Sequence, residues 1–293
     1  MEKAYESLSL FEFQQCFATD NQCLAYLAAE KWRNGYICPK CGHTHYCEGG
    51  SLYSRQCTRC KHTDSPTAGT LFHKVKFSLL KAFYIVYFVS TSKTGIASTE
   101  LSRKLGLGQK TCWYFKRKVM KAMKSSGDHL LTGNINVDEF FVGGQEGGKK
   151  GRGKGKKKLV VLAIEKRERG ISRMYGKVIE KADAKNLGRF MKDTIESKAM
   201  IKTDKWVGYN PLKKDFKNLT QLASGEKGGN FPEIHRAIMI FKSWLRGIYH
   251  SVNDLQSYID EYTYRFNRHF MKASIFHNLI LRMINEKPYY LCA

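Results

Sequence analysis

The chain has 293 residues, of which 42% are hydrophobic, so it can bury one large core or two to three smaller ones and is not disordered as a whole. Lysine and arginine outnumber aspartate and glutamate by 50 to 26, a formal net charge of +24 that favours nucleic acid as the partner over a merely soluble basic protein. The first ten residues lack the apolar core of a secretory signal, and no apolar run reaches the roughly 20 residues of a membrane span. Together with nine cysteines, these features predict a reducing, cytoplasmic location with thiols and metal instead of disulfides.

Residues 36–66 are predicted to form a zinc ribbon, preceded by a helical cap in residues 1–35, where apolar residues recur at helical spacing. The ribbon contains two Cys-x2-Cys pairs, namely Cys38, Cys41, Cys57 and Cys60. Each pair can direct two thiolates into one tight turn, and four thiolates in a tetrahedron suit Zn²⁺. His43, His45 and Cys47 lie between the pairs and are alternative ligands, although their use would break the pairing. A closed four-cysteine site leaves no open coordination position, so we expect the zinc to be structural.

Residues 67–127 are predicted to be a helical, DNA-binding region of the helix-turn-helix type. After a buried helix over 78–91, a second helix starts near Ser98, which can cap it, and a turn at 106–108 leads into a basic helix over 109–123. The side chains of this last helix that we expect to contact DNA are Lys110, Lys116, Arg117, Lys118 and Lys121. Simple core packing is the alternative, because two helices joined by a glycine turn occur in many proteins.

The pattern from 128 to 285 predicts an RNase H-like α/β domain, in which three strands are followed by a helix, a short strand and further helices. The expected strands begin at residue 134 and then cover 159–165, 171–179, 199–203 and 218–223, with a helix over 182–197 and mostly helix from 234 to 285. The chain as a whole is therefore expected to be a multidomain α/β protein with C-terminal helices.

A glycine- and lysine-rich segment, 143–158, separates the first two predicted strands. Such a run is typical of a flexible, solvated loop, and it would also bind phosphates without reading sequence. Its position just after Asp138 favours the second role. The DNA-binding residues expected here are Lys150, Arg152, Lys154 and Lys156.

Asp138 and Asp204 are the candidate catalytic carboxylates, since they fall on the first and fourth predicted strands, which are neighbours in an RNase H-like sheet. Two close carboxylates repel each other unless a cation joins them. Mg²⁺ suits such a site because it prefers hard oxygen ligands, and two metal ions can clamp both oxygens of a phosphodiester displacement. On spacing alone, ordinary strand-end and turn roles remain the alternative.

Several motifs together make residues 8–270 similar to one family. They are the segments 35–41, 57–60, 67–73, 92–96, 137–144, 201–204, 208–209, 235–247 and 264–268. The chain resembles the insertion-sequence transposases of the DDE class that carry an N-terminal zinc ribbon, the ISXO2-like group related to Merlin elements.

This resemblance implies cleavage of transposon ends and transfer of the freed strand to target DNA, with Mg²⁺ or Mn²⁺ as the catalytic metal. The implied catalytic residues are Asp138, Asp204, His235 and Lys242. A third carboxylate is the simpler pattern, but members of the group can place Glu, Asn or His there, with Lys seven residues later. Glu233 is therefore the alternative to His235. Together with Lys242, Arg246 is expected to hold DNA phosphate from the same helix face.

The implied partner is double-stranded DNA, both the terminal inverted repeats and the target, bound by a homodimer or larger assembly near the bacterial nucleoid, away from membranes. Three alternatives stay open. One is a non-enzymatic regulator built from the zinc ribbon and helix-turn-helix. Another is a structure-specific nuclease on the same fold, and the third is an inactive transposase copy, given His235 in place of a carboxylate.

Overall fold

A computed structural model describes residues 8–92, 94–124, 127, 129–144, 157–168, 170–226, 229–249 and 252–290. The chain divides into two compact units: the first comprises Met1–Met123 with Phe270–Ala293, and the second comprises Lys124–His269. The boundary near residue 124 lies close to the expected boundary at 128. The C-terminal boundary differs, because the last helix belongs to the first unit and not to the predicted 128–285 domain.

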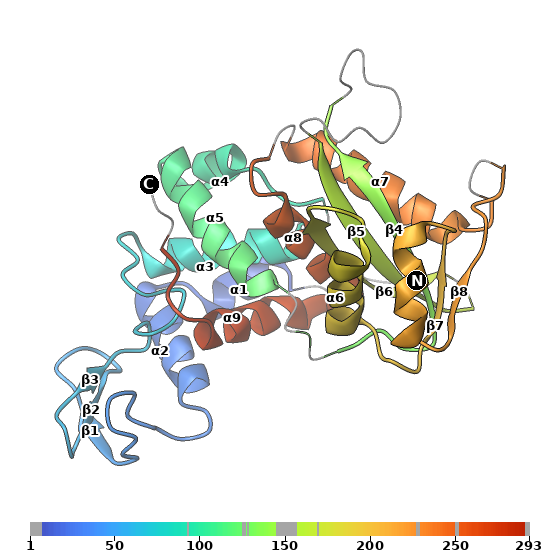
Figure 1. Ribbon diagram of the computed structural model, residues 1–293. Helices are drawn as coiled ribbons and strands as arrows, with labels where there is room; N and C mark the ends of the chain where they lie inside the picture. The colour runs from blue at the N-terminus through green and yellow to red at the C-terminus, as the bar shows by residue number, and fades with distance from the viewer. Residues whose placement is uncertain are drawn as a thin grey trace. The chain divides into compact units, whose positions relative to one another are not determined.

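The first unit is a small three-stranded sheet joined to a bundle of helices (Figure 1). Its elements are α1 (Leu10–Cys16), α2 (Asp20–Lys31), β1 (Tyr46–Glu48), β2 (Arg55–Cys57), β3 (Thr63–Asp64), α3 (Leu79–Thr91), α4 (Ser98–Leu105), α5 (Gln109–Met123) and α9 (Ile275–Asn285). Helix α9 packs against α2, α3 and α5, and the backbone N–H of Leu71 donates to the carbonyl of Met283 at 3.0 Å. The sequence of α9 shows that the helix is amphipathic but not which helices it packs against. Here its partners lie more than 150 residues earlier in the chain.

Hydrogen bonds tie the sheet to the helical bundle through Lys31, at the end of α2. Its Nζ donates to Asp64 Oδ1 at 2.7 Å and to the carbonyls of Ser65 and Ala68, both at 2.8 Å. The lysine is mostly buried, so each of its three ammonium protons has a fixed acceptor. The helical cap expected in residues 1–35 is thereby attached directly to the ribbon.

Helices α4 and α5 pack together and are joined at Gly106, whose left-handed φ of 58° ends α4. The helix over 109–123 is observed as predicted. Ser98 does not cap α4, since the N-cap is Ala97 and makes no side-chain cap bond. Instead the Ser98 hydroxyl accepts a hydrogen bond from Gln109 Nε2 at 2.9 Å, which links the starts of the two helices.

The second unit contains a five-stranded sheet in the order β6-β5-β4-β7-β8. Its strands are β4 (Asn134–Val142), β5 (Lys158–Lys166), β6 (Ile171–Ile179), β7 (Met200–Thr203) and β8 (Leu219–Gln221). The first three strands are antiparallel, and β7 and β8 run parallel to β4. The first and fourth strands of the domain are therefore neighbours, and the predicted RNase H-like fold is confirmed.

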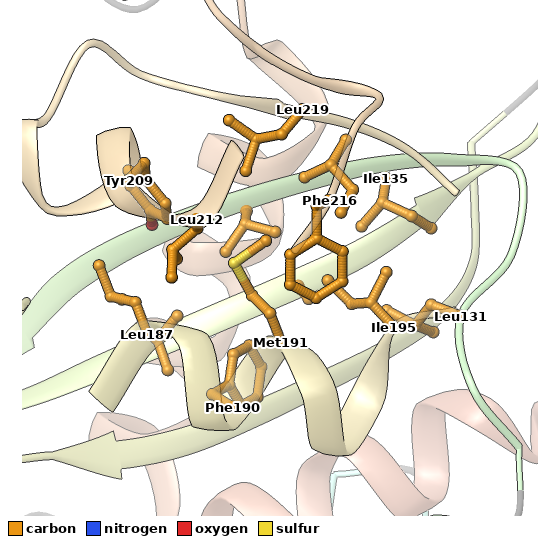
Figure 2. Close-up of a cluster of buried hydrophobic side chains, with 14 of the residues drawn as sticks. Leu131, Ile135, Leu187, Phe190, Met191, Ile195, Tyr209, Leu212, Phe216 and Leu219 are labelled. Atoms are coloured by element: carbon orange, nitrogen blue, oxygen red, sulfur yellow. The ribbon is translucent and has the colours of Figure 1, made fainter. Parts of the chain in front are cut away.

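Helices cover both faces of this sheet. They are α6 (Ala184–Thr194), η1 (Val207–Lys214), α7 (Pro232–Tyr249) and α8 (Leu255–Asn267), and a short 3-10 segment, η3 (His269–Ser274), follows α8. One face of the sheet packs under α6 and η1 around the cluster drawn in Figure 2. The opposite face packs under α7 and α8.

Strand alternation assigns neighbouring residues of β4 to opposite faces. Ile135 and Val137 point into the α6 core, whereas Phe140 points into the α7 core. By the same alternation Asp138 belongs to the α7 face and Glu139 to the α6 face. The sequence pair Asp138-Glu139 is thus divided between the two sides of the sheet.

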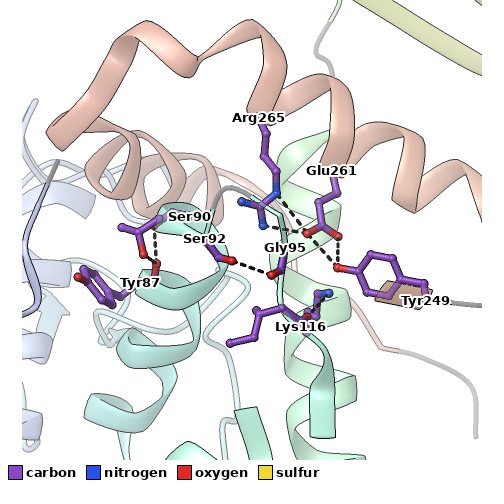
Figure 3. Close-up of polar contacts among 10 residues, drawn as sticks. Tyr87, Ser90, Ser92, Gly95, Lys116, Tyr249, Glu261 and Arg265 are labelled. Carbon is purple, nitrogen blue, oxygen red and sulfur yellow. Dashed lines mark hydrogen bonds and ion pairs between the residues drawn. The ribbon is translucent and has the colours of Figure 1, made fainter. Parts of the chain in front are cut away.

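On the α7 side, a buried charged group connects the end of α7 to α8. Glu261 is fully buried, and it accepts hydrogen bonds from Arg265 Nη2 at 2.9 Å and from the Tyr249 hydroxyl at 3.3 Å (Figure 3).

In the part of the chain that the structure describes, every helix is too short or too polar to span a membrane.

Candidate functional site

The zinc ribbon brings its four predicted ligands together. The four cysteine sulfurs lie within 4.8 Å of one another. The Sγ atoms of Cys38 and Cys60 are 3.6 Å apart. Those of Cys41 and Cys57 are also 3.6 Å apart. Sulfurs at the corners of a tetrahedron with Zn–S bonds of about 2.3 Å would be separated by about 3.8 Å, so the cluster fits structural zinc.

Two equivalent turns hold the cysteines. The N–H of Gly42 donates to the carbonyl of Cys38 at 2.9 Å, and the N–H of Lys61 donates to that of Cys57 at 3.0 Å. Burial raises the pKa of the Cys38 thiol, but backbone N–H groups at Lys40 and Cys41 outweigh it and lower the pKa to about 6. Backbone donors also lower the pKa of Cys57 against the effect of burial. A backbone donor at His43 lowers the pKa of Cys41, but burial and contacts with the other three cysteines outweigh it and raise the pKa to about 12. The backbone donors of the turns therefore favour the thiolate, the form that binds zinc, at Cys38 and Cys57.

The alternative ligands have other contacts. His43 Nε2 lies 3.1 Å from the hydroxyl of Thr58, and the His43 ring packs beside that of His45. Cys47 Sγ donates to the carbonyl of Gln56 at 3.6 Å. Within the described ranges, the four cysteines form the one group of three or more His, Cys, Asp or Glu side chains with metal-binding geometry.

Asp138, on β4, and Asp204, just past the end of β7, lie at equal distances along the chain from the pairing of these two strands. The pairing of β4 with β7 joins Asn134 to Met200 and Asn136 to Lys202. Both aspartates lie two residues beyond the last pair, so the same register, continued past that pair, would place them side by side. Each has one oxygen fixed by a nearby backbone group: the N–H of Glu139 donates to Asp138 Oδ1 at 2.8 Å. The N–H of Trp206 donates to Asp204 Oδ1 at 3.0 Å.

The turn after Asp204 is held from two sides. Gln221 Nε2, on β8, donates to the carbonyl of Asp204 at 3.3 Å and to that of Trp206 at 3.0 Å. The indole N–H of Trp206 donates to the carbonyl of Ala182 at 2.6 Å. An open pocket lined by Asp204, Lys205, Trp206, Ala223 and Ser224 lies beside this turn. The second aspartate is thus on a fixed turn at an accessible edge.

Helix α7 places His235 and Lys242 on the Asp138 side of the sheet. His235 Nε2 lies 3.3 Å from Asp138 Oδ2, and Lys242 Nζ lies 5.1 Å from the centre of the Phe140 ring. Burial, with help from the charge of Arg246, lowers the pKa of Lys242, while the nearby Asp138 opposes that shift. The structure therefore brings three of the predicted catalytic residues together around β4.

Glu233 occupies a different position. Its Oε1 lies 2.9 Å from Lys166 Nζ, and this hydrogen bond holds the pKa of Glu233 below its ordinary value of 4.5. Lys166 pairs with Asn134 at the far end of β4, four residues from Asp138. The structure accordingly places His235, and not Glu233, beside the first aspartate.

Sequence reasoning missed Tyr209 and the role of Glu139. The Tyr209 side chain is 0% exposed, and its hydroxyl donates to Glu139 Oε2 at 2.8 Å. Burial raises the pKa of Tyr209 well above its ordinary value, as do the charges of Glu139, Asp138 and Asp204. The motif 208–209 was visible in the sequence, but only the strand alternation and the 3-10 turn show which carboxylate the tyrosine reaches.

The basic side chains expected to contact DNA have different environments. Lys110 is exposed at the start of α5, Lys118 and Lys121 are half-buried further along it, and Arg246 is exposed on α7. Lys116 and Arg117 differ from the expectation, because they are 4% and 7% exposed. Lys116 Nζ donates to the carbonyl of Ile96 at 2.7 Å, close to the Ser92–Gly95 hydrogen bond (Figure 3). The remaining candidates, Lys150, Arg152, Lys154 and Lys156, lie outside the described residues.

The buried position of Lys116 and Arg117 has a simple cause. Helix α5 packs against α3, α4 and α9, so more than one of its faces is covered. A helix that is basic in sequence is expected to have a solvated face, but here the long side chains extend along the packed surface to reach carbonyls and aromatic rings.

The strand order and the four-cysteine cluster together define an RNase H-like α/β protein that carries a zinc ribbon. The sequence matches the ISXO2-like transposase domain over residues 130–267 and the transposase zinc-ribbon domain over residues 18–63. The chain belongs to this family of insertion-sequence transposases, and it acts on DNA.

A relative from Halobacterium salinarum, described as an uncharacterized protein in the transposable element ISH50, is 26% identical over 216 residues, which cover 68% of this chain and 72% of that protein. Among solved structures, a pre-cleavage Mos1 transpososome matches with a TM-score of 0.30 and 9% identity over 70% of this chain and 79% of that chain. A Mos1 mariner paired-end complex with Mn matches with a TM-score of 0.32 and 12% identity over 64% of this chain and 72% of that chain. Family membership rests on the sequence matches.

Proposed function

We propose that this transposase cleaves the ends of its element and joins the freed strand to target DNA by DDE-type chemistry, with Asp138 and Asp204 as the two central carboxylates. The observation that carries the proposal is the register of β4 and β7, which aligns both aspartates two residues beyond the last strand pair. Two carboxylates held close together repel each other unless a cation joins them. Their proximity therefore favours a metal site over ordinary strand-end roles.

The donor set fits a hard divalent cation such as Mg²⁺ or Mn²⁺. Both aspartates offer carboxylate oxygen, and backbone N–H groups orient one oxygen of each. When bound there, the cation would polarise the scissile phosphate and offset the negative charge that builds up on it. His235 would complete the ligand set through Nε2, or bind the attacking water instead.

The remaining residues hold and orient DNA. Lys242 and Arg246 follow His235 on one side of α7, where their cationic groups bind phosphate beside Asp138. Where His235 does not bind the cation, the same Nε2, which lies 3.3 Å from Asp138 Oδ2, would hydrogen-bond the attacking water or hydroxyl. The same two aspartates serve cleavage and joining, so no covalent bond between protein and DNA is needed.

Binding of the element ends falls to the basic side chains further from the carboxylates. Lys110, at the exposed start of α5, contacts phosphate as the first turn of a recognition helix does, and Lys121 near the end of α5 is a further phosphate contact. Lys150, Arg152, Lys154 and Lys156 follow Asp138 closely in the sequence and lie outside the described residues; their charge would let them bind phosphate without reading sequence. A homodimer or larger assembly pairs the two ends of the element.

The test is cleavage of linear DNA that carries the element's own terminal repeats, in Mg²⁺ or Mn²⁺, by the full-length zinc-loaded protein. Asp138→Asn and Asp204→Asn are each expected to reduce cleavage by about a thousandfold, because each removes a charge that holds the cation. Asp215→Asn is the matched control. It removes a surface carboxylate of the same unit that pairs with Lys192 at 2.7 Å, and it should leave cleavage unchanged.

Undiminished cleavage by both variants would overturn the assignment of the active site. A wild-type protein that binds the ends but cleaves none of them in either metal would contradict the proposal and support a DNA-binding regulator or an inactive copy.

A further inference from the structure

The pairing between β4 and β7 ends before the proposed catalytic aspartates, although Asp138 remains paired with Leu162 of β5. The last printed pair between β4 and β7 is Asn136 with Lys202, and β7 ends at Thr203. Asp138 and Asp204 both lie past this point, so no backbone pair in the register of β4 with β7 holds the two residues next to each other. Two carboxylates tend to move apart, so their separation has to be set by contacts outside the ladder.

On the β4 side, Glu139 supplies two such contacts. Its backbone N–H donates to Asp138 Oδ1 at 2.8 Å, which fixes the orientation of the first carboxylate. Its side chain points to the other face of the sheet, where Oε2 accepts the hydrogen bond of the Tyr209 hydroxyl at 2.8 Å. One residue therefore joins the first aspartate to the segment that follows the second.

On the β7 side, residues 204–209 form a closed turn. The N–H of Trp206 donates to Asp204 Oδ1 at 3.0 Å, and the N–H of Tyr209 donates to the carbonyl of Trp206 at 3.2 Å. Gly208 permits this close packing, because an added Cβ would lie 2.5 Å from the carbonyl oxygen of Ala182. The position of the Tyr209 side chain is thus coupled to that of Asp204 through the hydrogen bonds that join residues 204, 206 and 209.

We propose that the buried Tyr209–Glu139 hydrogen bond is a positioning contact that holds Asp204 at the correct distance from Asp138 for a divalent cation. The inference rests on the proposed function, because it concerns the same two carboxylates. Tyr209 is fully buried on the opposite face of the sheet from Asp138, so it touches neither DNA nor metal. It acts through the backbone, as a support that keeps the site arranged before the metal binds.

Mn²⁺ titration of the full-length, zinc-loaded protein, followed by the electron paramagnetic resonance signal of free Mn²⁺, tests this proposal without any cleavage reaction. The Mn²⁺ binding that the wild-type protein shows and Asp138→Asn lacks is assigned to the proposed catalytic site. Tyr209→Phe keeps the ring and removes the hydroxyl, and it is expected to raise the Mn²⁺ concentration for half-saturation of that site by about tenfold, the effect of one hydrogen bond to a charged group. Glu139→Gln, which keeps an acceptor oxygen, should shift it less than Glu139→Ala.

Tyr249→Phe is the matched control. It also removes a tyrosine hydroxyl that donates to a buried carboxylate, that of Glu261, but this contact lies at the end of α7 about 20 Å along the helix from His235. Both tyrosine variants should melt at a lower temperature, and only Tyr209→Phe should weaken Mn²⁺ binding.

The possible failures are distinguishable. Equal Mn²⁺ affinities for Tyr209→Phe and wild type, with binding lost in Asp138→Asn, would overturn the positioning role and leave the metal site in place. An equal loss of affinity in both tyrosine variants would also overturn it, because a general loss of stability would then explain the effect. Undiminished Mn²⁺ binding in Asp138→Asn would overturn the proposed metal site itself.

Discussion

At the scale of single residues, the two zinc turns of the ribbon differ in one instructive way. Gly42 and Lys61 follow equivalent cysteines and both adopt left-handed backbone, with φ of 73° and 57°. Glycine adopts this conformation without strain, whereas the left-handed backbone of a residue with a Cβ costs about 1–2 kcal/mol of strain. The second turn therefore stores strain that the first does not, although both make the same hydrogen bonds.

Exchanging the residue types should reverse this difference. Gly42→Ala should destabilise the zinc-loaded ribbon by about 1 kcal/mol through backbone strain alone, because the added Cβ meets nothing within 4 Å. Lys61→Gly should stabilise it by about 0.5 kcal/mol, since the released strain exceeds the entropy cost of glycine. Hydrogen exchange in residues 36–66 measures the ribbon separately, with zinc content as the control. Slower exchange in Gly42→Ala than in wild type would contradict this account.

The same scale shows what spacing in the sequence can reveal. The four cysteines were predictable because each pair lies within one local turn. The roles of Asp138 and Asp204 stay a prediction, which the neighbouring positions of β4 and β7 in the sheet support. The Tyr209–Glu139 contact was not predictable, since it depends on which face of β4 each residue occupies and on a 3-10 turn that no simple period marks. Contacts made through tertiary structure thus escape local patterns even when both residues lie in recognisable motifs.

At the scale of the elements, α7 makes two polar side-chain contacts with the sheet, and they have separate roles. Near the start of α7, Glu233 binds Lys166 on β5. Two residues later, His235 faces Asp138. The first contact anchors the helix to the sheet, and the second belongs to the proposed catalytic site. Sequence alone could not decide between Glu233 and His235, because both precede Lys242 on the same helix.

The pH dependence of stability separates these two residues. The bond from Lys166 lowers the folded-state pKa of Glu233 below its ordinary 4.5, so the contact stabilises the fold fully above about pH 4.5 and is lost as the pH falls through the lower folded value. Glu233→Gln should therefore lower the unfolding free energy at pH 7 by about 0.5–1 kcal/mol, and the difference from wild type should shrink below pH 4.5. Denaturant unfolding between pH 7 and pH 4 measures it.

Cleavage of the element ends gives the complementary result. Glu233→Gln should cleave at nearly the wild-type rate, whereas His235→Ala should lose at least about tenfold, the effect of one hydrogen bond at the reacting atoms. If Glu233→Gln abolished cleavage while His235→Ala did not, Glu233 would have to be the third catalytic residue.

Element boundaries were predicted best where a periodic pattern met a clear stop. The bounds of α5 and β6 agree with prediction, because Gly108 and the turn before Ile171 interrupt the pattern. The burial of Lys116 and Arg117 was not predictable, because the sequence of α5 does not show how many helices surround it. Charge patterns reveal a solvated face only when the neighbouring elements are known.

At the scale of the whole molecule, the chain leaves the first unit at residue 123 and returns to it at residue 270. The returning helix α9 completes a core, since Leu279, Ile280 and Met283 are each 0% exposed. Aromatic rings of α1 and α3 also pack against Phe276. The RNase H-like unit is thus inserted into the sequence of the unit that carries the zinc ribbon, an arrangement that local patterns cannot show because both ends of the interrupted unit are ordinary amphipathic helices.

Leu279→Ala tests this assignment. Truncation of a fully buried leucine costs about 2–5 kcal/mol, and the cost should appear in the unit whose core the side chain fills. Hydrogen exchange followed by mass spectrometry should therefore accelerate in α2, α3 and α5 and stay unchanged in β4, β5 and β6. Leu187→Ala, which truncates a leucine of α6 that is also 0% exposed, is the matched control and should give the opposite pattern. If Leu279→Ala accelerated exchange in the sheet and spared α2 and α3, then α9 would belong to the catalytic unit, as the 128–285 boundary assumed, and the first unit would have to end at residue 123.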